Sequence, residues 1–301
     1  MKRFLATLLL TLTSILNMNA EKTNYERRPI TLGEGDKLAI MMVHFGTTKD
    51  EPRAKTFNAI NSEVAAAFPE AKVVEAYSSR IVMRILRDRG INYYSPKEML
   101  EKLHTDGYTH VIVQSTHIID GVEMESLRRD VENCNSFFKD IRVSRPLLYT
   151  PDDYRQAITA MKGEIKTEAD AVLLVGHGTY EPITASYAML DYMLKIEGTP
   201  NWSIATIEGY PTFDNGVTML EQINAKSVCL APCMFVAGEH AAGDIAEDWN
   251  NDLKKRGYKV ELQLRGLGEF PAIRSIFIDH IRFSMENVHL DIMKKKQDYA
   301  K

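Results

Sequence analysis

Two histidines and one glutamate stand where three apolar runs end in the second half of this 301-residue chain. His177 follows the run AVLLVG, Glu208 ends the run WSIATIE, and His240 follows SVCLAPCMFVAGE. Neighbouring parallel strands deliver their carboxyl ends to one edge of a sheet, so three such residues can meet whatever their separation in sequence. Two imidazoles and one carboxylate suit a first-row divalent metal ion with coordination positions left open. The sequence therefore predicts a metal site formed by His177, Glu208 and His240.

Each of these residues also has a structural interpretation. His177 in the motif GHGT could be a hydrogen-bonded turn residue, and Glu208 a solvated carboxylate at a strand end. His240 could equally be a residue at the start of a helix. Taken alone, the structural interpretation is favoured for His177 and for Glu208. The occurrence of all three at matching strand ends favours the metal site.

The elements that position these residues alternate between strand and helix. Predicted strands cover 38–45, 72–77, 109–115 and 142–149 in the first half, and 171–175, 202–207, 227–236 and 258–264 in the second, with helices between them. A last helix is expected over 287–301. Nearly uniform apolar strands separated by helices predict an α/β fold with parallel sheets and right-handed crossovers.

The two halves also resemble each other. Gly46-Thr47 corresponds to Gly178-Thr179, and Glu75 corresponds to Glu208. This repeat predicts two similar Rossmann-like lobes with a ligand-binding cleft between the carboxyl ends of their strands. In the first lobe the positions of the three candidate ligands hold Phe45, Glu75 and Glu123, so only the second lobe has nitrogen ligands.

Some further polar residues could face this cleft. His44 and His117 end first-lobe strands, but a structural hydrogen-bonding role is somewhat favoured for both. A series of arginines could meet acidic groups of a ligand, although a solvated helix face is the default interpretation. These arginines are Arg80, Arg84, Arg87 and Arg89.

The first 20 residues, MKRFLATLLLTLTSILNMNA, have the basic start, short apolar run and polar end of a secretory signal peptide. We expect residues 1–20 to be a signal, 21–36 a linker, 37–155 the N-terminal lobe, and 156–301 the C-terminal lobe with the metal site. The apolar run is short for a membrane span, so export, with a periplasmic location, is favoured over an uncleaved anchor and stable membrane insertion.

Composition limits the other classes of function. With 45% hydrophobic residues the chain can bury a sizeable core, and a net charge of −4 makes nucleic acid an unlikely partner. Three cysteines are too few for a disulfide framework. Cys229 and Cys233, about 13 Å apart along an extended strand, are expected to be buried packing residues.

Seven motifs, in order, resemble the anaerobic sirohydrochlorin cobaltochelatase family. These short class II tetrapyrrole chelatases are related in fold to ferrochelatase, and the resemblance covers about residues 37–283. The motifs are MMVHFGTT, YSSRIVMRIL, VQSTHIIDGVEME, LLVGHGTYEP, IEGYPTFD, PCMFVAGEHAAGDIAEDW and GLGEFPAIRSIFIDHI.

The resemblance implies insertion of cobalt(II) into a sirohydrochlorin-type tetrapyrrole during anaerobic cobalamin synthesis. Cobalt would be a substrate, with iron, nickel or zinc as alternatives, and no organic cofactor would be required. By matching motifs, His177 resembles the catalytic histidine and metal ligand, Glu208 the carboxylate ligand, and His240 the second histidine ligand. The expected macrocycle contacts are Thr47, Ser79, Arg80 and His117.

Export departs from the mainly cytoplasmic location of cobalamin synthesis, so two alternatives stay open. The first is an exported metal or haem binding and delivery protein that uses the same cleft without catalysis. The second is a two-lobed sugar or amino-acid binding protein, which would not need two histidines and a glutamate on one lobe. The sequence also leaves open whether the protein forms a homo-oligomer.

Overall fold

The structure is a computed structural model that describes residues 24–239, 241–290, 293 and 296–297. The predicted signal segment and the predicted ligand His240 lie outside the described residues. Within the described part of the chain, no helix is both long enough and apolar enough to cross a membrane.

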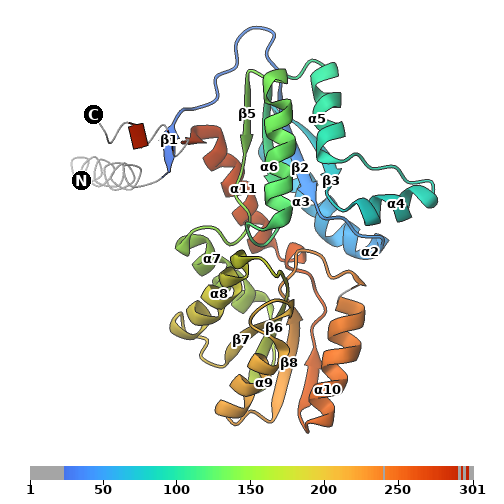
Figure 1. Cartoon of the computed structure of the whole chain (residues 1–301), viewed down its shortest axis with the longest axis vertical. Helices are drawn as coiled ribbons and strands as arrows, with labels where there is room; N and C mark the ends of the chain where they lie inside the picture. Colours follow the sequence, from blue (N-terminus) through green and yellow to red (C-terminus); the bar gives the residue numbers. More distant parts are fainter. Residues whose placement is uncertain (1–23, 240, 291–292, 294–295, 298–301) are drawn as a thin grey trace, which may run out of the picture.

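Two parallel four-stranded sheets form the two lobes (Figure 1). The first has the order β3-β2-β4-β5 and the second the order β7-β6-β8-β9, so corresponding strands take corresponding places and the predicted repeat is confirmed. The strands of the first sheet are β2 (Leu38–His44), β3 (Lys72–Tyr77), β4 (His110–Ser115) and β5 (Asp140–Val143). Those of the second are β6 (Ala171–Gly178), β7 (Trp202–Glu208), β8 (Ser227–Pro232) and β9 (Lys259–Leu262).

Several helices begin at residues whose side chains cap them. Ser95 starts α5 (Pro96–Thr105), Thr150 starts α7 (Pro151–Glu164), and Thr212 starts α9 (Phe213–Gln222), each with a reciprocal capping box. Proline at the first position of α5 and α7 has the backbone angle that a helix start needs.

The remaining helical segments follow the predicted alternation, except η5 and α11, which were not predicted. They are α2 (Asp50–Arg53), η1 (Ala54–Asn58), α3 (Ala59–Ala67), α4 (Arg80–Asp88), α6 (Val122–Cys134), η2 (Asn135–Phe137), η3 (Pro182–Thr184), α8 (Ala185–Ile196), η4 (Ala241–Trp249), α10 (Asn250–Lys255), η5 (Leu267–Glu269) and α11 (Pro271–Glu286).

The two lobes share part of their hydrophobic core. One cluster of buried residues joins β2 in the first lobe to β6 in the second through α7 and α11. Two smaller clusters lie on the other face of each sheet. α11 contacts α7, β4 and α3, so the last long helix packs against both halves of the chain (Figure 1). The expected boundary between the lobes, at residues 155 and 156, falls inside α7. This helix was not predicted from the sequence, and the boundary itself stays a prediction.

Both ends of the described chain differ from expectation. The segment predicted as a linker contains β1 (Tyr25–Arg27), and the segment predicted to begin a last helix starts with β10 (Asn287–His289). The two strands pair antiparallel. The guanidinium of Arg142 also donates to the carbonyls of Ser284, Met285 and Asn287. The strand pairing joins residues more than 250 positions apart, which no local pattern reveals.

Three predicted strands are clearly shorter than expected. β9 covers Lys259–Leu262 rather than 258–264. β5 ends at Val143, and the buried residues Leu147 and Leu148 further along bond through their amides to the carbonyls of His117 and Ile118 beyond β4. β8 ends at Pro232 rather than Val236. All three cysteines are buried, as was predicted for Cys229 and Cys233.

Candidate metal and tetrapyrrole site

His177 and Glu208 lie at the tips of adjacent strands. The register of β6 and β7 pairs Gly178 with Glu208, so the two candidate ligands are one position apart along the sheet edge. Both side chains are partly buried. Nδ1 of His177 lies 3.1 Å from the carbonyl oxygen of Gly178. When Nδ1–H donates to this carbonyl, the lone pair is on Nε2, where a metal ion would bind.

Two glycines allow the strand tips to approach closely. A Cβ at Gly178 would lie 1.7 Å from the carbonyl oxygen of Glu208, and a Cβ at Gly209 would lie 2.1 Å from that of Thr179. Both residues have positive φ, 84° and 86°. Larger residues would therefore be excluded here by both backbone conformation and space. The second glycine of the motif GHGT and the glycine of the motif IEGY thus allow the two strand tips to come into contact.

The loop after β7 is held by threonine side chains. The hydroxyl of Thr184 donates to the carbonyl of Tyr210 at 2.8 Å and accepts from its amide at 3.1 Å. The hydroxyl and amide of Thr206 both donate to the carbonyl of Pro211, at 2.8 and 2.7 Å. These bonds fix the backbone beside Glu208.

The third predicted ligand, His240, directly follows the described loop 233–239. Among the described residues, no three His, Cys, Asp or Glu side chains are grouped so that they could hold a metal ion. The predicted ligand set therefore depends on His240 as the third member beside His177 and Glu208.

The corresponding edge of the first lobe does not offer a second site of this kind among the described residues. Phe45 takes the place of His177 and is 43% exposed. His44 is fully buried, with Nδ1 3.0 Å from the hydroxyl of Thr116 and Nε2 3.1 Å from Oδ1 of Asn61. Burial lowers the pKa of His44 to about 3. His44 is thus a neutral structural residue, the interpretation that the sequence favoured.

The four predicted macrocycle contacts differ in accessibility. Thr47 is buried and its hydroxyl accepts from the amide of Lys49. Ser79 is buried and caps α4 by accepting from the amide of Val82. His117 is half-buried near the hydroxyls of Ser78 and Ser115, and burial lowers its pKa. Arg80 is exposed at the first position of α4.

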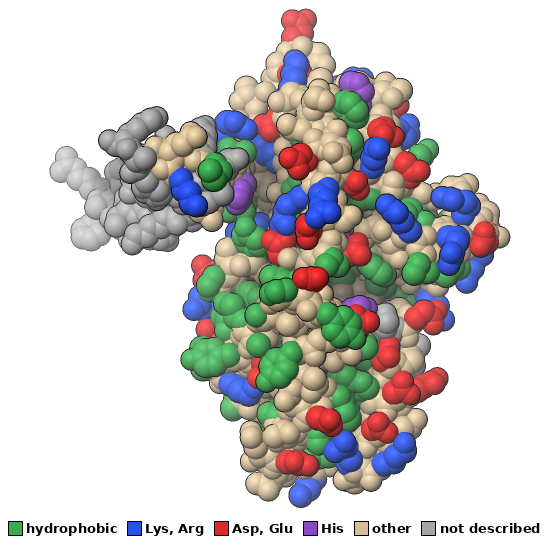
Figure 2. Space-filling view, viewed as in Figure 1, with side chains coloured by type: hydrophobic (Ala, Val, Ile, Leu, Met, Phe, Trp, Pro, Cys, Tyr) green, Lys and Arg blue, Asp and Glu red, His purple; other side chains and the backbone are tan. Residues whose placement is uncertain are grey.

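Sequence reasoning missed a set of apolar residues at the same strand ends. Five large side chains, at strand tips or at the start of the helix that follows a strand, are exposed by 43% to 82%. Loops lie on the protein surface, so a large apolar residue shortly after a strand was the available signal. Figure 2 shows hydrophobic side chains gathered where the two lobes meet. The set is Phe45, Ile81, Val122, Tyr180 and Tyr210.

Positive charge lies beside this set on α4. Arg80, Arg84 and Arg87 are exposed, and none takes part in an ion pair among the described residues. Figure 2 shows Lys and Arg side chains gathered over this part of the first lobe. An anionic ligand edge near α4 would therefore meet guanidinium groups that form no close ion pair among the described residues.

A cavity of about 290 Å³ lies between the lobes. Its first-lobe wall is the start of α6, including Val122, Glu125 and Arg128, and its second-lobe wall is the segment Glu181 to Ile183. The carboxylate of Asp120 accepts two bonds from Arg128, both at 2.6 Å. The cavity marks a gap between the lobes at the carboxyl edges of both sheets.

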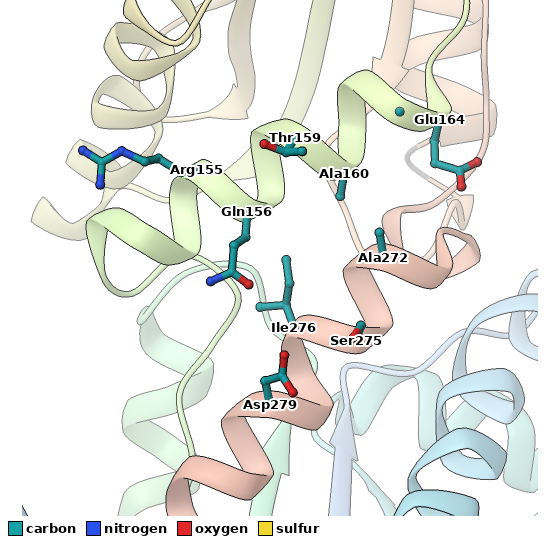
Figure 3. A pocket seen from close by; sticks show the side chains of 10 residues that line it. Arg155, Gln156, Thr159, Ala160, Glu164, Ala272, Ser275, Ile276 and Asp279 are labelled. Carbon is teal, nitrogen blue, oxygen red and sulfur yellow. The ribbon is translucent and has the colours of Figure 1, made fainter. Parts of the chain in front are cut away.

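Another cavity, of about 510 Å³, lies between α7 and α11 and holds none of the predicted site residues (Figure 3). Its three charged residues already have partners: Arg155 pairs with Asp152 and Glu197, Glu164 with Arg265, and Asp279 with Arg282. This cavity therefore gives no independent indication of a ligand.

Comparison with known proteins identifies the family. The family model for cobalt chelatase (CbiK) matches residues 38–286. The chain is 34% identical over 252 residues to the sirohydrochlorin cobaltochelatase of Salmonella typhimurium, covering 81% of this chain and 95% of that protein. It is 31% identical over 254 residues to sirohydrochlorin cobaltochelatase CbiKC of Nitratidesulfovibrio vulgaris, covering 81% of this chain and 89% of that one.

Solved structures agree on the fold. SirB from Bacillus subtilis with Fe3+ superposes with a TM-score of 0.59 at 14% identity, covering 83% of this chain and 96% of that one. CbiX, described as the terminal enzyme for biosynthesis of sirohaem in denitrifying bacteria, superposes with a TM-score of 0.52 at 14% identity, covering 82% and 99%. The predicted two-lobed chelatase-like α/β fold and the predicted family are both confirmed, and the chain belongs to the cobalt chelatase (CbiK) family.

Proposed function

We propose that this protein inserts cobalt(II) into a sirohydrochlorin-type tetrapyrrole, as a step of anaerobic cobalamin synthesis. The observation that carries this proposal is the juxtaposition of His177 and Glu208 at adjacent strand tips, at the edge where exposed apolar side chains of both lobes are found. Membership of the cobalt chelatase family supports the same activity.

The proposed metal ligands are His177, Glu208 and His240, with cobalt(II) as the substrate ion. Two imidazoles and one carboxylate leave coordination positions open for water and then for the pyrrole nitrogens. Iron, nickel or zinc would also fit such ligands, since affinity for these donors does not by itself select cobalt. The physiological metal is then set by supply and by geometry.

The apolar set would contact the faces of the planar macrocycle. Phe45, Ile81 and Val122 offer a first-lobe surface, while Tyr180 and Tyr210 offer a second-lobe surface. Aromatic and aliphatic side chains stabilise a flat ring by burial and by offset stacking. Carboxylates on the macrocycle rim would bind Arg80, and Thr47, Ser79 and His117 complete the proposed lining.

Insertion releases two protons from the macrocycle for each divalent ion that binds its four nitrogens. A neutral imidazole can accept a proton near neutral pH, so we assign His177 as the base as well as a ligand. When a pyrrole nitrogen takes over the metal, Nε2 of His177 regains its lone pair and can take one of the two protons, while water takes the other. The hydrogen bond between Nδ1 and Gly178 would hold the ring in place during this exchange.

A single-turnover assay tests the activity. The purified protein is mixed with sirohydrochlorin and cobalt(II) without oxygen, and the change in the macrocycle's absorption spectrum is followed. We expect the wild type to form the cobalt complex faster than the free reactants, and His177→Ala and Glu208→Gln to lose at least tenfold of that rate, as loss of a metal ligand or base would. A wild-type rate equal to that of the free reactants would contradict the proposal.

The second candidate function is delivery of a metal or haem by an exported protein. The basic and apolar pattern of residues 1–20 favours it. We propose export to the periplasm in either case, and fractionation of cells that express the full chain measures it. If the wild-type protein binds cobalt or haem stably but forms no metallated product, the delivery function is favoured.

A further inference from the structure

The loop between β8 and η4, residues 233–239, packs against the first lobe although it belongs to the second. Phe235 at its centre is 6% exposed. Its ring is nearly parallel to that of Phe57 in the first lobe, with centroids 5.8 Å apart and an interplanar angle of 4°. The imidazole of His44 stacks on Phe57 at 4.3 Å. Three rings therefore connect the end of β2 to this loop.

The second lobe surrounds Phe235 from the other side. A Cβ at Gly268 would lie 2.5 Å from the phenyl ring, and a Cβ at Gly266 would lie 2.6 Å from the carbonyl oxygen of Phe235. The amide of Gly268 donates to that carbonyl at 2.8 Å, and the ring of Phe277 meets the phenyl edge-on at 5.5 Å. Space for Phe235 is thus created by two residues without side chains.

Both ends of the loop are also held in place. At its start, the amide of Cys233 donates to the carbonyl of Val175 at 2.7 Å, two residues before His177. At its end, the carboxylate of Glu239 pairs with Lys49 of the first lobe at 3.1 Å. This ion pair is exposed and contributes little stability by itself. Between these two points the loop is held by the buried ring of Phe235 and by two backbone bonds, from the amides of Leu267 and Gly268 to the carbonyls of Met234 and Phe235.

We propose that Phe235 is a positioning residue, and that its stack with Phe57 lets the first lobe set the place of the 233–239 loop relative to the tip of β6. The inference rests on the proposed function, because the loop runs from beside His177 to the residue before His240. A change in its path alters the spacing of the ligands. Residues that orient metal ligands without touching the metal typically change its affinity by about 10- to 100-fold when they are mutated.

The experiment removes the stack from either side. Phe57→Leu alters only the first lobe, while Phe235→Leu alters the loop itself. The controls are Phe68→Leu in the first lobe and Phe270→Leu in the second, since both residues are buried phenylalanines outside the stack, 4% and 2% exposed. Cobalt(II) affinity is measured on the full metal-free protein without tetrapyrrole, together with amide hydrogen exchange of residues 233–239 and the thermal midpoint.

We expect Phe57→Leu and Phe235→Leu to weaken cobalt binding about tenfold and to speed exchange in 233–239, while both controls stay within about twofold of the wild type. Equal cobalt affinity in the stack variants and their controls would overturn the proposal.

If the wild-type protein binds no cobalt, the proposed metal site is wrong. Amide hydrogen exchange alone then tests whether the first lobe positions the 233–239 loop. Faster exchange of 233–239 in Phe57→Leu, but not in Phe68→Leu, supports positioning by the first lobe. Equal exchange in the two variants refutes it.

Discussion

The close approach of β6 and β7 depends on Gly178 having no side chain, so Gly178→Ala is the sharpest test of the site's architecture. The new methyl group would lie 1.7 Å from the carbonyl oxygen of Glu208 and 2.7 Å from Cβ of Thr206. To reach an ordinary contact of 3.4 Å, the methyl carbon and this oxygen must separate by about 1.7 Å. Because Glu208 belongs to the backbone that moves, the metal site must change with it.

Two costs set the expected loss of stability. An alanine at φ 84° is in the left-handed region, which costs about 1–2 kcal/mol for a residue with a Cβ. Displacing the neighbouring backbone adds about 1–3 kcal/mol, the usual range for overpacking. The free energy of unfolding should therefore fall by about 2–5 kcal/mol, from a typical total of about 5–15 kcal/mol. We expect a folded protein whose cobalt affinity is reduced at least tenfold.

Gly257→Ala is the matched control. Gly257 also lies in the second lobe and has φ 92°, but a Cβ added there would have no other atom within 4 Å, so only the backbone cost applies. Urea unfolding should show a loss of about 1–2 kcal/mol, with cobalt affinity unchanged. The reasoning would be refuted if the two variants lost the same stability and both bound cobalt like the wild type.

Two further predictions concern buried polar groups. Burial lowers the pKa of His44 to about 3, against about 6.5 in the unfolded chain, so its contribution to stability is complete above pH 6.5 and is lost as the pH falls toward 3. Between about pH 8 and pH 5.5, the wild type should therefore lose about 1.4 kcal/mol more of its free energy of unfolding than His44→Gln loses. Equal losses for the two proteins in urea titrations would contradict this. Arg274→Met removes the bonds of 2.9 and 2.6 Å to Glu63 and the bond to Gly268, and should cost about 2 kcal/mol or more because Arg274 is buried. Arg256→Met, which breaks the exposed pair with Asp214, should cost under about 1 kcal/mol in the same measurement. Equal costs for the two variants would contradict the larger contribution expected of the buried arginine.

Much of the sheet architecture could be predicted from the sequence, because the central strands of both sheets, such as β2 and β6, are short apolar runs with their own boundaries. The correspondence of Gly46-Thr47 with Gly178-Thr179 predicted that the strands before them are equivalent. The matching strand orders of the two sheets confirm this prediction. The approximate strand ends also placed His177 and Glu208 at one edge, which the register of β6 and β7 confirms. The complete ligand set stays a prediction, since His240 lies outside the described residues.

The sequence by itself determined the fold class, the family and the residue types at the strand tips, because these depend on local patterns and short motifs. Only the tertiary structure decided which distant segments meet. The pairing of β1 with β10, the packing of α11 against both halves, and the stack of Phe235 on Phe57 all depend on contacts between residues far apart in the chain. The same holds for polar groups: His44 and His117 look alike as residues at strand ends, and only the packing around them shows that His44 is fully buried while His117 is half-buried. Local pattern sets which face of an element is apolar, whereas the environment of a single side chain is set by everything that packs around it.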